Sequence, residues 1–395
     1  MFKRLINFLD AIFRSGVTEF KLFFKDSAVY VSFLGTSIIV CFLYSSIYGN
    51  ETLQKLPVAV VDLDNSPLSR ELIRMTDATQ GVLIYQNVTS LEKAEQLFFR
   101  EEVRGILYIP KDFSGKLQKG QPASVSAYCD ASYMLYYKTY LGGLNKALAT
   151  FNAQLEINTS MKHGINIRYA ALQRRSINVQ SIGLFNPSAG YATFVMPVVC
   201  LIIIQATLLT AIGIMGGTQR ERKVHHSTYI AEGEELNIIA VLIGRALNYL
   251  ILCILVILIM LGFCFTLFRL PQRGNLLDII VFMIPFFLSI IFLGMALVGL
   301  FRKREDCLFV IPFISLPAVF LTGTSWPTVV IPQFLQSVAY ILPTTVGVRG
   351  FMGLTQMGAS LSEIKDLWGQ MWLTCLFYFI IALVVENKLL QRQQA

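Results

Sequence analysis

Charged residues are scarce in this sequence. Only 15% of its 395 residues are Asp, Glu, Lys or Arg, whereas 54% are hydrophobic. An average soluble protein has roughly 25% charged and about 45–50% apolar residues. A soluble globule of this length could not keep so much apolar surface away from water, which excludes soluble enzymes, secreted toxins and disordered scaffolds. The net charge of +8 is small and dispersed, which argues against nucleic-acid binding.

The sequence also lacks the residue patterns of metal sites and of catalytic sites. None of the seven cysteines shows CxxC spacing, and the three histidines have no Cys or carboxylate at ligand spacing, so we predict no metal site. The sequence also lacks a GxxxxGKS/T phosphate loop, a GxSxG elbow and an HExxH motif. We therefore predict no catalytic residue and no cofactor bound by this chain itself.

Ionisable residues are nearly absent from the apolar stretches. The last five predicted spans lack a mid-membrane Asp, Glu or His, which disfavours an ion-gradient transporter. Arg245 is the main charge inside a span, and it either snorkels to the interface or pairs with a neighbouring helix.

Long apolar stretches predict an α-helical integral membrane protein with six transmembrane helices. Residues 1–27 come first, with apolar and basic residues at helical spacing, which indicates an amphipathic helix in the cytoplasmic interface. The first span is expected at residues 28–48, and five more within residues 192–386. These five lie near Ala192–Met215, Ile239–Leu267, Leu277–Phe301, Cys307–Thr324 and Trp368–Val385, and residues 387–395 form a tail.

Basic residues decide the orientation of these spans. The N-terminal arm, residues 220–223, residues 302–304 and the tail all fall on one side, which the positive-inside rule assigns to the cytoplasm. Both termini are then cytoplasmic, and residues 50–188 lie outside.

The polar segment at residues 50–188 predicts an inserted α/β extracytoplasmic domain. Ser66 is placed to cap a helix that begins at Pro67, and from Ser132 to about Ser176 we expect one long helix or a helical hairpin. The expected strands are Leu56–Asp62, Val82–Tyr85, Gly105–Ile109 and Ala123–Tyr128, with a helix at Leu91–Phe99.

The loop Gly216–Asn237 is the most suggestive cytoplasmic segment. A basic half precedes an acidic half, and two interpretations stay open: a solvated turn that anchors the orientation, or a short helix that docks on a soluble partner and transmits its motion. The candidate coupling residues are Arg220, Glu221, Arg222, Lys223, Glu232, Glu234 and Glu235.

The segment Phe320–Thr345 cannot form one continuous helix, because it contains Gly323, Pro327, Pro332 and Pro343. Non-helical backbone at membrane depth survives only when it is buried in protein or lines a cavity. Trp326 suits the outer interface. We predict a broken, partly re-entrant hairpin near an outer gate, with an ordinary surface loop as the alternative.

Four stretches resemble one family. They are VVDLDNSPLSRELI (Val60–Ile73), FNPSAGYATFVMP (Phe185–Pro197), TQRERK (Thr218–Lys223) and FLTGTSWPTVVIPQFLQSVAYILPTT (Phe320–Thr345). In this order they resemble the permease subunit of type-2 ATP-binding-cassette (ABC) exporters with a large extracytoplasmic domain between the first two spans. The resemblance covers essentially the whole chain. It departs at His225–Thr228, where the family usually has Gly-Thr and a short apolar helix.

The resemblance implies one half of an ATP-driven exporter in a bacterial inner (cytoplasmic) membrane. A second permease copy or a paralogue would complete the pathway, and a separate ABC ATPase subunit would bind ATP and Mg. That subunit would contact residues 1–27 and the Gly216–Asn237 loop. In a cell with two membranes, the outer domain would also receive a periplasmic adaptor leading to an outer-membrane channel.

Few fixed charges in the spans favour an apolar or amphiphilic cargo, such as a drug, a lipid or a lipopeptide. The alternative function is a non-transporting membrane receptor or a secretion-machine scaffold that uses the extracytoplasmic domain. A membrane-bound enzyme is least favoured, because no catalytic constellation is present.

Overall fold

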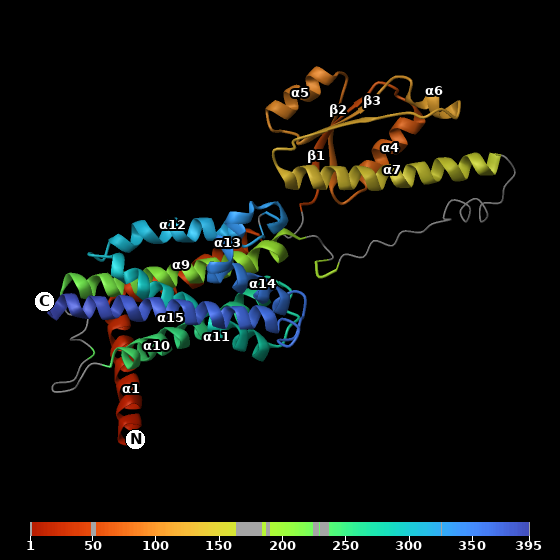
Figure 1. Ribbon diagram of the computed structural model, residues 1–395. Helices are drawn as coiled ribbons and strands as arrows, with labels where there is room; N and C mark the ends of the chain where they lie inside the picture. The colour runs from red at the N-terminus through yellow and green to blue at the C-terminus, as the bar shows by residue number, and fades with distance from the viewer. Residues whose placement is uncertain are drawn as a thin grey trace. The chain divides into compact units, whose positions relative to one another are not determined.

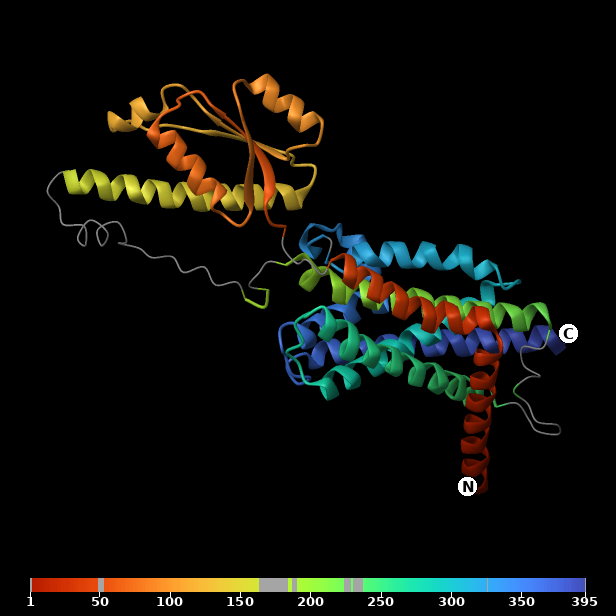
Figure 2. The same ribbon diagram turned by 180° about the vertical axis from the view of Figure 1, so that it is seen from behind.

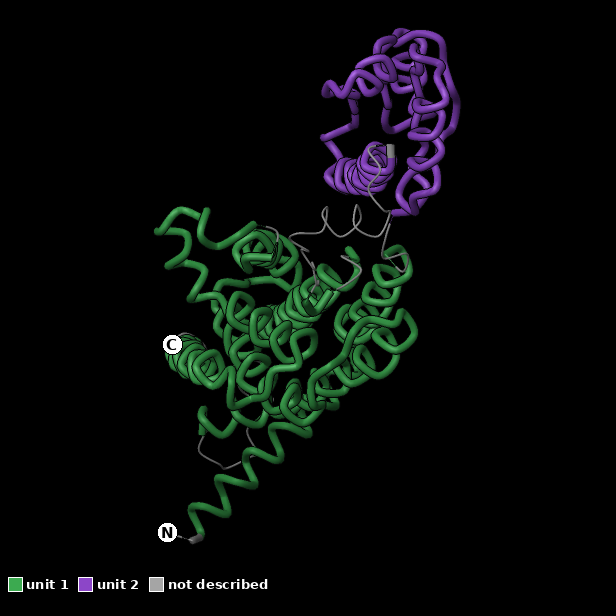
Figure 3. Tube along the Cα trace, turned by 90° about the vertical axis from the view of Figure 1, so that its right-hand side faces the viewer, with its two compact units in different colours: residues 1–51, 183–395 green, residues 52–182 purple. Residues whose placement is uncertain are grey.

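The computed structural model describes residues 2–48, 53–162, 184–186, 190–223, 229, 237–324 and 326–394. The chain divides into two compact units, one formed by residues 1–51 and 183–395 and the other by residues 52–182 (Figure 3). The larger unit is helical, and the smaller one is built on a four-stranded sheet.

The sheet of the smaller unit has the strand order β2-β1-β3-β4. β1 (Leu56–Asp62) pairs in parallel with β2 (Val82–Val88) and β3 (Gly105–Ile109), and β4 (Ser126–Cys129) pairs antiparallel with β3. The first and third predicted strands are confirmed at the same bounds. β2 extends three residues beyond its predicted end at Tyr85, and β4 begins at Ser126 instead of Ala123.

Helices cover both faces of this sheet (Figures 1 and 2). α4 (Pro67–Asp77) and α7 (Met134–Lys162) share a core with Val58 and Val60 of β1, whereas α5 (Leu91–Phe99) packs with Ala59 and Val61 on the opposite face. β1 is therefore apolar at successive positions, as expected for a strand buried on both sides. α6 (Phe113–Gln118) adds Phe113 to the first of these cores.

Local sequence signals position the helices of this unit. Ser66 caps α4, because its hydroxyl accepts a hydrogen bond from the Ser69 backbone N–H, as predicted. α7 is held to the sheet by Tyr140, whose buried hydroxyl donates to the Ile106 carbonyl at 2.9 Å. α7 confirms a long helix as far as Lys162, and the rest of the predicted helical stretch lies outside the described residues.

The larger unit contains five helical stretches that are long and apolar enough to cross a membrane, within the described ranges. The first consists of α2 (Ser27–Tyr30), η1 (Val31–Gly35) and α3 (Thr36–Ile47). The others are α9 (Tyr191–Glu221), α10 with η3 (Ile238–Ile259 and Met260–Phe265), α11 with η4 (Leu276–Leu297 and Val298–Leu300), and α15 (Lys365–Gln394).

The expected fifth span, Cys307–Thr324, is shorter than the sequence predicts. α12 (Asp306–Leu321) has 16 residues, or about 24 Å at 1.5 Å per residue, against a hydrocarbon core of roughly 30 Å. The helix ends two residues before Gly323, whose φ of +83° is left-handed. The described residues thus contain five helices of spanning length and one short apolar helix, and not six full spans.

α11 packs against α9, α10, α14 (Pro343–Thr355) and α15 in the larger unit. Its aromatic residues meet α14, where Gly347 and Gly350 leave room for the rings of Phe286 and Phe282. A Cβ atom at either glycine would lie within 2.2 Å of a ring atom. Two further short elements, η5 (Thr328–Val330) and α13 (Gln333–Ile341), connect α12 to α14.

α1 (Phe2–Lys25) crosses the other helices of its unit instead of running along them (Figures 1 and 2). Its backbone approaches α10 closely at Gly16 and Gly244, where a Cβ on Gly244 would lie 2.3 Å from the Ile12 carbonyl oxygen. This crossing is the arrangement that an amphipathic helix in the membrane interface requires.

We predict that Cys129 of β4 resists alkylation at neutral pH. Burial raises the pKa of its thiol to about 11, so the reactive thiolate forms only when the pH approaches that value. At pH 8, iodoacetamide should modify Cys129 about 100-fold more slowly than a thiol of ordinary pKa near 8.5 to 9, and the rate should rise roughly tenfold per pH unit.

Residue-level mass spectrometry of the whole protein measures this rate. The variant Ala131→Cys, at an exposed position two residues away, provides the control. Equal alkylation rates for Cys129 and the introduced cysteine at pH 8 would contradict the prediction.

Candidate functional site

The predicted coupling loop begins on the last turns of α9. Gly216 and Gly217 let this part of α9 approach η4 and the following turn, because a Cβ at Gly217 would lie 2.7 Å from the Lys303 carbonyl oxygen. Arg220 reaches the same turn, and its Nη1 donates to the carbonyl oxygens of Val298 and Gly299 at 2.8 and 2.9 Å. A cation at the end of a helix stabilises the carbonyls that lack partners there.

The predicted coupling residues therefore occupy different surroundings. Arg220 is partly buried and holds two helix ends together, whereas Glu221, Arg222 and Lys223 are exposed. The acidic half of the loop, Glu232, Glu234 and Glu235, lies outside the described residues. Arg222 and Lys223 are the basic residues of this group that a soluble partner could reach directly.

A buried polar cluster lies close to this loop, and we call it the Arg245 cluster. Arg245 of α10 is 1% exposed and stands between two buried carboxylates, Glu19 of α1 and Glu386 of α15. Its Nε lies 3.4 Å from Glu19 Oε2, and its Nη1 lies 3.1 Å from Glu386 Oε1. The cluster consists of Arg245, Glu19, Glu386, Tyr249, Tyr229 and Gln219.

Two tyrosines complete the hydrogen bonding of Glu19. The Tyr249 hydroxyl, one turn along α10 from Arg245, donates to Glu19 Oε1 at 2.7 Å. The Tyr229 hydroxyl donates to the other oxygen of Glu19 and accepts a hydrogen bond from Gln219 Nε2 at 2.7 Å. The guanidinium of Arg245 also lies over the Tyr229 ring, 5.2 Å from its centroid.

The Arg245 cluster connects four parts of the chain. Glu19 belongs to α1, Gln219 and Tyr229 to the predicted coupling loop Gly216–Asn237, Arg245 and Tyr249 to α10, and Glu386 to α15. The ion pairs of Arg245 with Glu19 and Glu386 and the hydrogen bonds of the two tyrosines with Glu19 thus join α1, α10, α15 and the loop.

Of the two interpretations of Arg245, the structure supports pairing with neighbouring helices. The sequence did not identify Glu19 and Glu386 as the partners of Arg245, although the spacing around Glu19 indicates that it is buried. Glu19 follows Ser15 and precedes Phe23 by four residues, so it falls on the face of α1 that packs inward and not on the charged face. Glu386 stands one residue beyond the predicted end of the last span, where a charge is unremarkable.

The predicted outer residues lie where the chain breaks between α12 and α14. Gly323 turns the chain after α12, Pro332 precedes the first residue of α13, and Pro343 is the first residue of α14. Pro327 precedes η5, and Trp326 is 58% exposed. Each proline stands before a helix or at its first position, where a backbone N–H would have no acceptor within the helix.

The segment Phe320–Thr345, which we call the outer segment after its predicted position, is attached to other helices of the larger unit. Gln336 of α13 stabilises the turn by donating from Nε2 to the carbonyls of Thr328 and Ile331, at 3.0 and 2.7 Å. The Tyr378 hydroxyl of α15 donates to the Ile341 carbonyl at 3.1 Å, and Thr344 donates to Gln205 of α9. The outer segment is thus linked to α9 and α15 through Thr344 and Ile341, and both helices also contribute to the Arg245 cluster.

We predict that Arg245→Met lowers the free energy of unfolding by about 3–5 kcal/mol, because two buried carboxylates lose their cation. The triple variant Arg245→Met/Glu19→Gln/Glu386→Gln should recover much of this loss, since it removes the uncompensated charges as well.

Thermal unfolding of the purified protein in detergent measures these effects, with Arg222→Met as a control that removes an exposed arginine. A melting temperature of Arg245→Met equal to that of wild type, or a triple variant less stable than the single one, would contradict the prediction.

Comparison with known proteins places this chain in a family. The profile described as "ABC-2 family transporter protein" matches residues 28–384. The Linearmycin resistance permease protein LnrN of Bacillus subtilis (strain 168) is 24% identical over 377 residues, which cover 89% of this chain and 92% of LnrN.

Two further relatives are more distant. The Probable multidrug ABC transporter permease YbhR of Escherichia coli is 20% identical, covering 80% of this chain and 81% of YbhR. ABC transporter G family member 20 of Dictyostelium discoideum is 22% identical, covering 90% of this chain and 47% of that protein. The profile match, the apolar helices and these relatives agree, and the chain belongs to the ABC-2 transporter family as a type-2 ABC permease subunit.

Proposed function

We propose that this chain is the membrane half of an ATP-driven exporter that moves an apolar or amphiphilic molecule outward by alternating access. A separate ATPase subunit provides the energy, and a second permease copy or a paralogue completes the pathway. The observation that carries the proposal is the Arg245 cluster, because it joins the predicted coupling loop and the amphipathic helix to two membrane helices.

The proposed mechanism follows from this connection. The ATPase docks on α1 and on the exposed residues Arg222 and Lys223. When ATP binding brings two ATPase subunits together, the load reaches Glu19 through α1 and Tyr229 through the loop. Arg245 then transmits it to α10 and α15, and α15 acts on the outer segment through Tyr378. No covalent chemistry is required of this chain.

The orientation is also part of the proposal. The basic residues near the cluster support a position on the cytoplasmic side, in a bacterial inner membrane. In this arrangement both termini are cytoplasmic, α12 with the outer segment forms the sixth crossing, and residues 50–188 lie outside. A periplasmic adaptor and an outer-membrane channel would then meet this outer domain.

The expected cargo is a drug, a lipid or a lipopeptide. The names of two relatives, one for linearmycin resistance and one for multidrug transport, support a drug. Apolar side chains dominate the helices of the larger unit, which suits a cargo without a large fixed charge. The receptor or scaffold alternative has no use for a buried connection between a cytoplasmic loop and the outer segment.

We predict that Arg222→Glu/Lys223→Glu reduces co-purification of the ATPase subunit from native membranes at least tenfold, because it reverses two exposed charges at the docking surface. Arg220 is left unchanged, since its loss would disturb the carbonyls of Val298 and Gly299.

Affinity purification in mild detergent, followed by an ATPase assay on the eluate, measures this effect. Lys111→Glu/Lys119→Glu, an equal change of charge at exposed residues of the smaller unit, is the matched control. Wild-type protein that elutes without any ATPase activity would favour the receptor or scaffold.

A further inference from the structure

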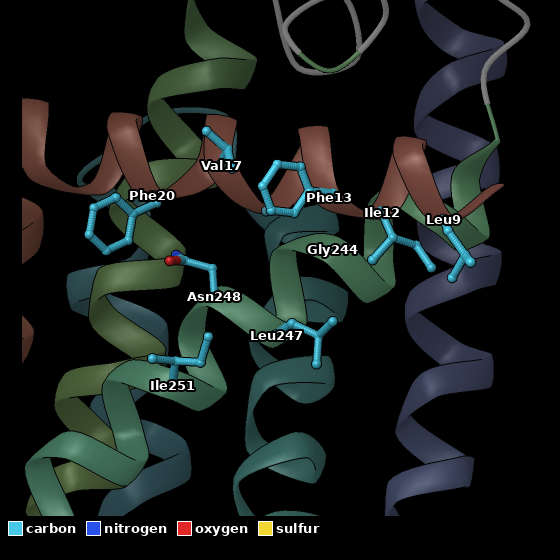
Figure 4. Close-up of a pocket in the computed structure, with 10 residues that line it drawn as sticks. Leu9, Ile12, Phe13, Val17, Phe20, Gly244, Leu247, Asn248 and Ile251 are labelled. Carbon is cyan, nitrogen blue, oxygen red and sulfur yellow. The ribbon is translucent and has the colours of Figure 1, made fainter. Parts of the chain in front are cut away.

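A groove lies where α1 crosses α10 (Figure 4). Its volume is about 320 Å³, and its walls are almost entirely apolar. Gly16 and Gly244, where the two backbones approach closely, also line it. The side chains that shape it are Leu9, Phe13 and Phe20 of α1 and Leu247, Asn248 and Ile251 of α10.

Asn248 is the polar side chain of this groove, and its amide is not satisfied. The residue is 5% exposed, and its Nδ2 has no hydrogen-bond partner among the described residues. Figure 4 shows the amide directed towards α1, close to Phe20. A buried amide donor without an acceptor is unfavourable, so a ligand that brings an acceptor oxygen into the apolar groove would gain a hydrogen bond there.

The groove is open at the outer surface of the helices. Phe13 is 71% exposed and Ile251 is 65% exposed, and both belong to segments that face lipid if α10 spans the bilayer. A ligand can therefore enter laterally, with an apolar chain against Phe13, Leu247 and Ile251.

The charge of α1 favours a ligand with an anionic head. Lys21 is exposed and follows Val17, a lining residue, by one helical turn, and Lys25 follows one turn later. Basic residues on an interfacial helix attract anionic lipid headgroups. Together these features fit a ligand with an apolar chain, an acceptor oxygen between that chain and the headgroup, and a negatively charged headgroup.

We propose that the groove between α1 and α10 binds the acyl chain of an anionic phospholipid of the cytoplasmic leaflet, with an ester carbonyl accepting a hydrogen bond from Asn248 Nδ2. The lipid fills the space beside the crossing of α1, one turn along α10 from Arg245. It thereby makes the position of α1 depend on the lipid composition. This proposal requires that α10 spans the membrane, and it does not depend on transport or on the ATPase.

The test uses the full-length protein in vesicles of phosphatidylcholine that contain a phosphatidylglycerol probe with a diazirine in its acyl chain. After illumination, mass spectrometry locates the labelled residues. We expect labelling to concentrate on residues 9–20 and 244–251. Asn248→Leu should reduce this labelling at least fivefold, and Ile251→Trp, which fills the groove, should do the same. Leu258→Trp, an exposed residue of α10 outside the groove, should leave it unchanged.

Competition distinguishes the possible occupants. Unlabelled phosphatidylglycerol should compete at least fivefold better than phosphatidylcholine or a free fatty acid of the same chain length, and Lys21→Glu/Lys25→Glu should remove this preference. Equal labelling of wild type, Asn248→Leu and Ile251→Trp would overturn the proposal. It would also be overturned if the wild-type groove remained unlabelled because a second copy of the chain covers it, or if the free fatty acid competed as well as the phospholipid.

Discussion

The packing of α1, α10 and α15 in the larger unit depends on the burial of one guanidinium group. A charge taken out of water is strongly unfavourable unless oppositely charged groups with good hydrogen-bond geometry surround it. Arg245 finds opposite charges only when α1 supplies Glu19, 3.4 Å from its Nε, and α15 supplies Glu386, which accepts a hydrogen bond from its Nη1. The positions of α1, α10 and α15 are therefore mutually dependent at this point. Tyr229 extends the same dependence to the loop after α9.

Close backbone packing determines how these helices can move. Small residues allow close backbone contact at the α1–α10 crossing, at the end of α9 and between α11 and α14. Helices packed so closely cannot slide gradually past one another, and they shift as units between discrete arrangements. In the mechanism that we propose, a load applied at Glu19 or Tyr229 is therefore carried along α10 and α15 instead of being absorbed locally. α15 and α9 reach the outer segment through Tyr378 and Gln205.

Composition and periodicity predict much of the architecture. The strands at Leu56–Asp62 and Gly105–Ile109 are recognisable because a buried strand needs an uninterrupted apolar run. The long spans are recognisable because a helix in lipid needs about 20 apolar residues. α12 was predicted too long because hydropathy does not register where a left-handed residue such as Gly323 ends a helix.

The partners of Arg245 could not be predicted in the same way. A charge within an apolar run indicates that a partner is needed. The partners of Arg245 are far away in the sequence, because Glu386 follows it by more than 140 residues and Glu19 precedes it by more than 220. Only the tertiary packing brings these residues together. Similarly, the basic cluster at residues 220–223 suggested one common role. The structure separates Arg220, which stabilises helix ends, from its exposed neighbours.

We propose that the Arg245 cluster makes the C-terminal ends of α1 and α15 move together during the ATPase cycle of the proposed exporter. The most direct test is a distance measurement by pulsed electron paramagnetic resonance between spin labels at Lys21→Cys and Lys388→Cys, two exposed positions on these helices. The complex with its ATPase is compared without nucleotide and after trapping with ATP and vanadate. We expect one narrow distance distribution that is the same in both states, and a broad distribution once Arg245 is replaced by Met. A distance that changes on trapping in the wild-type complex, or a narrow distribution that survives the loss of Arg245, would contradict the account.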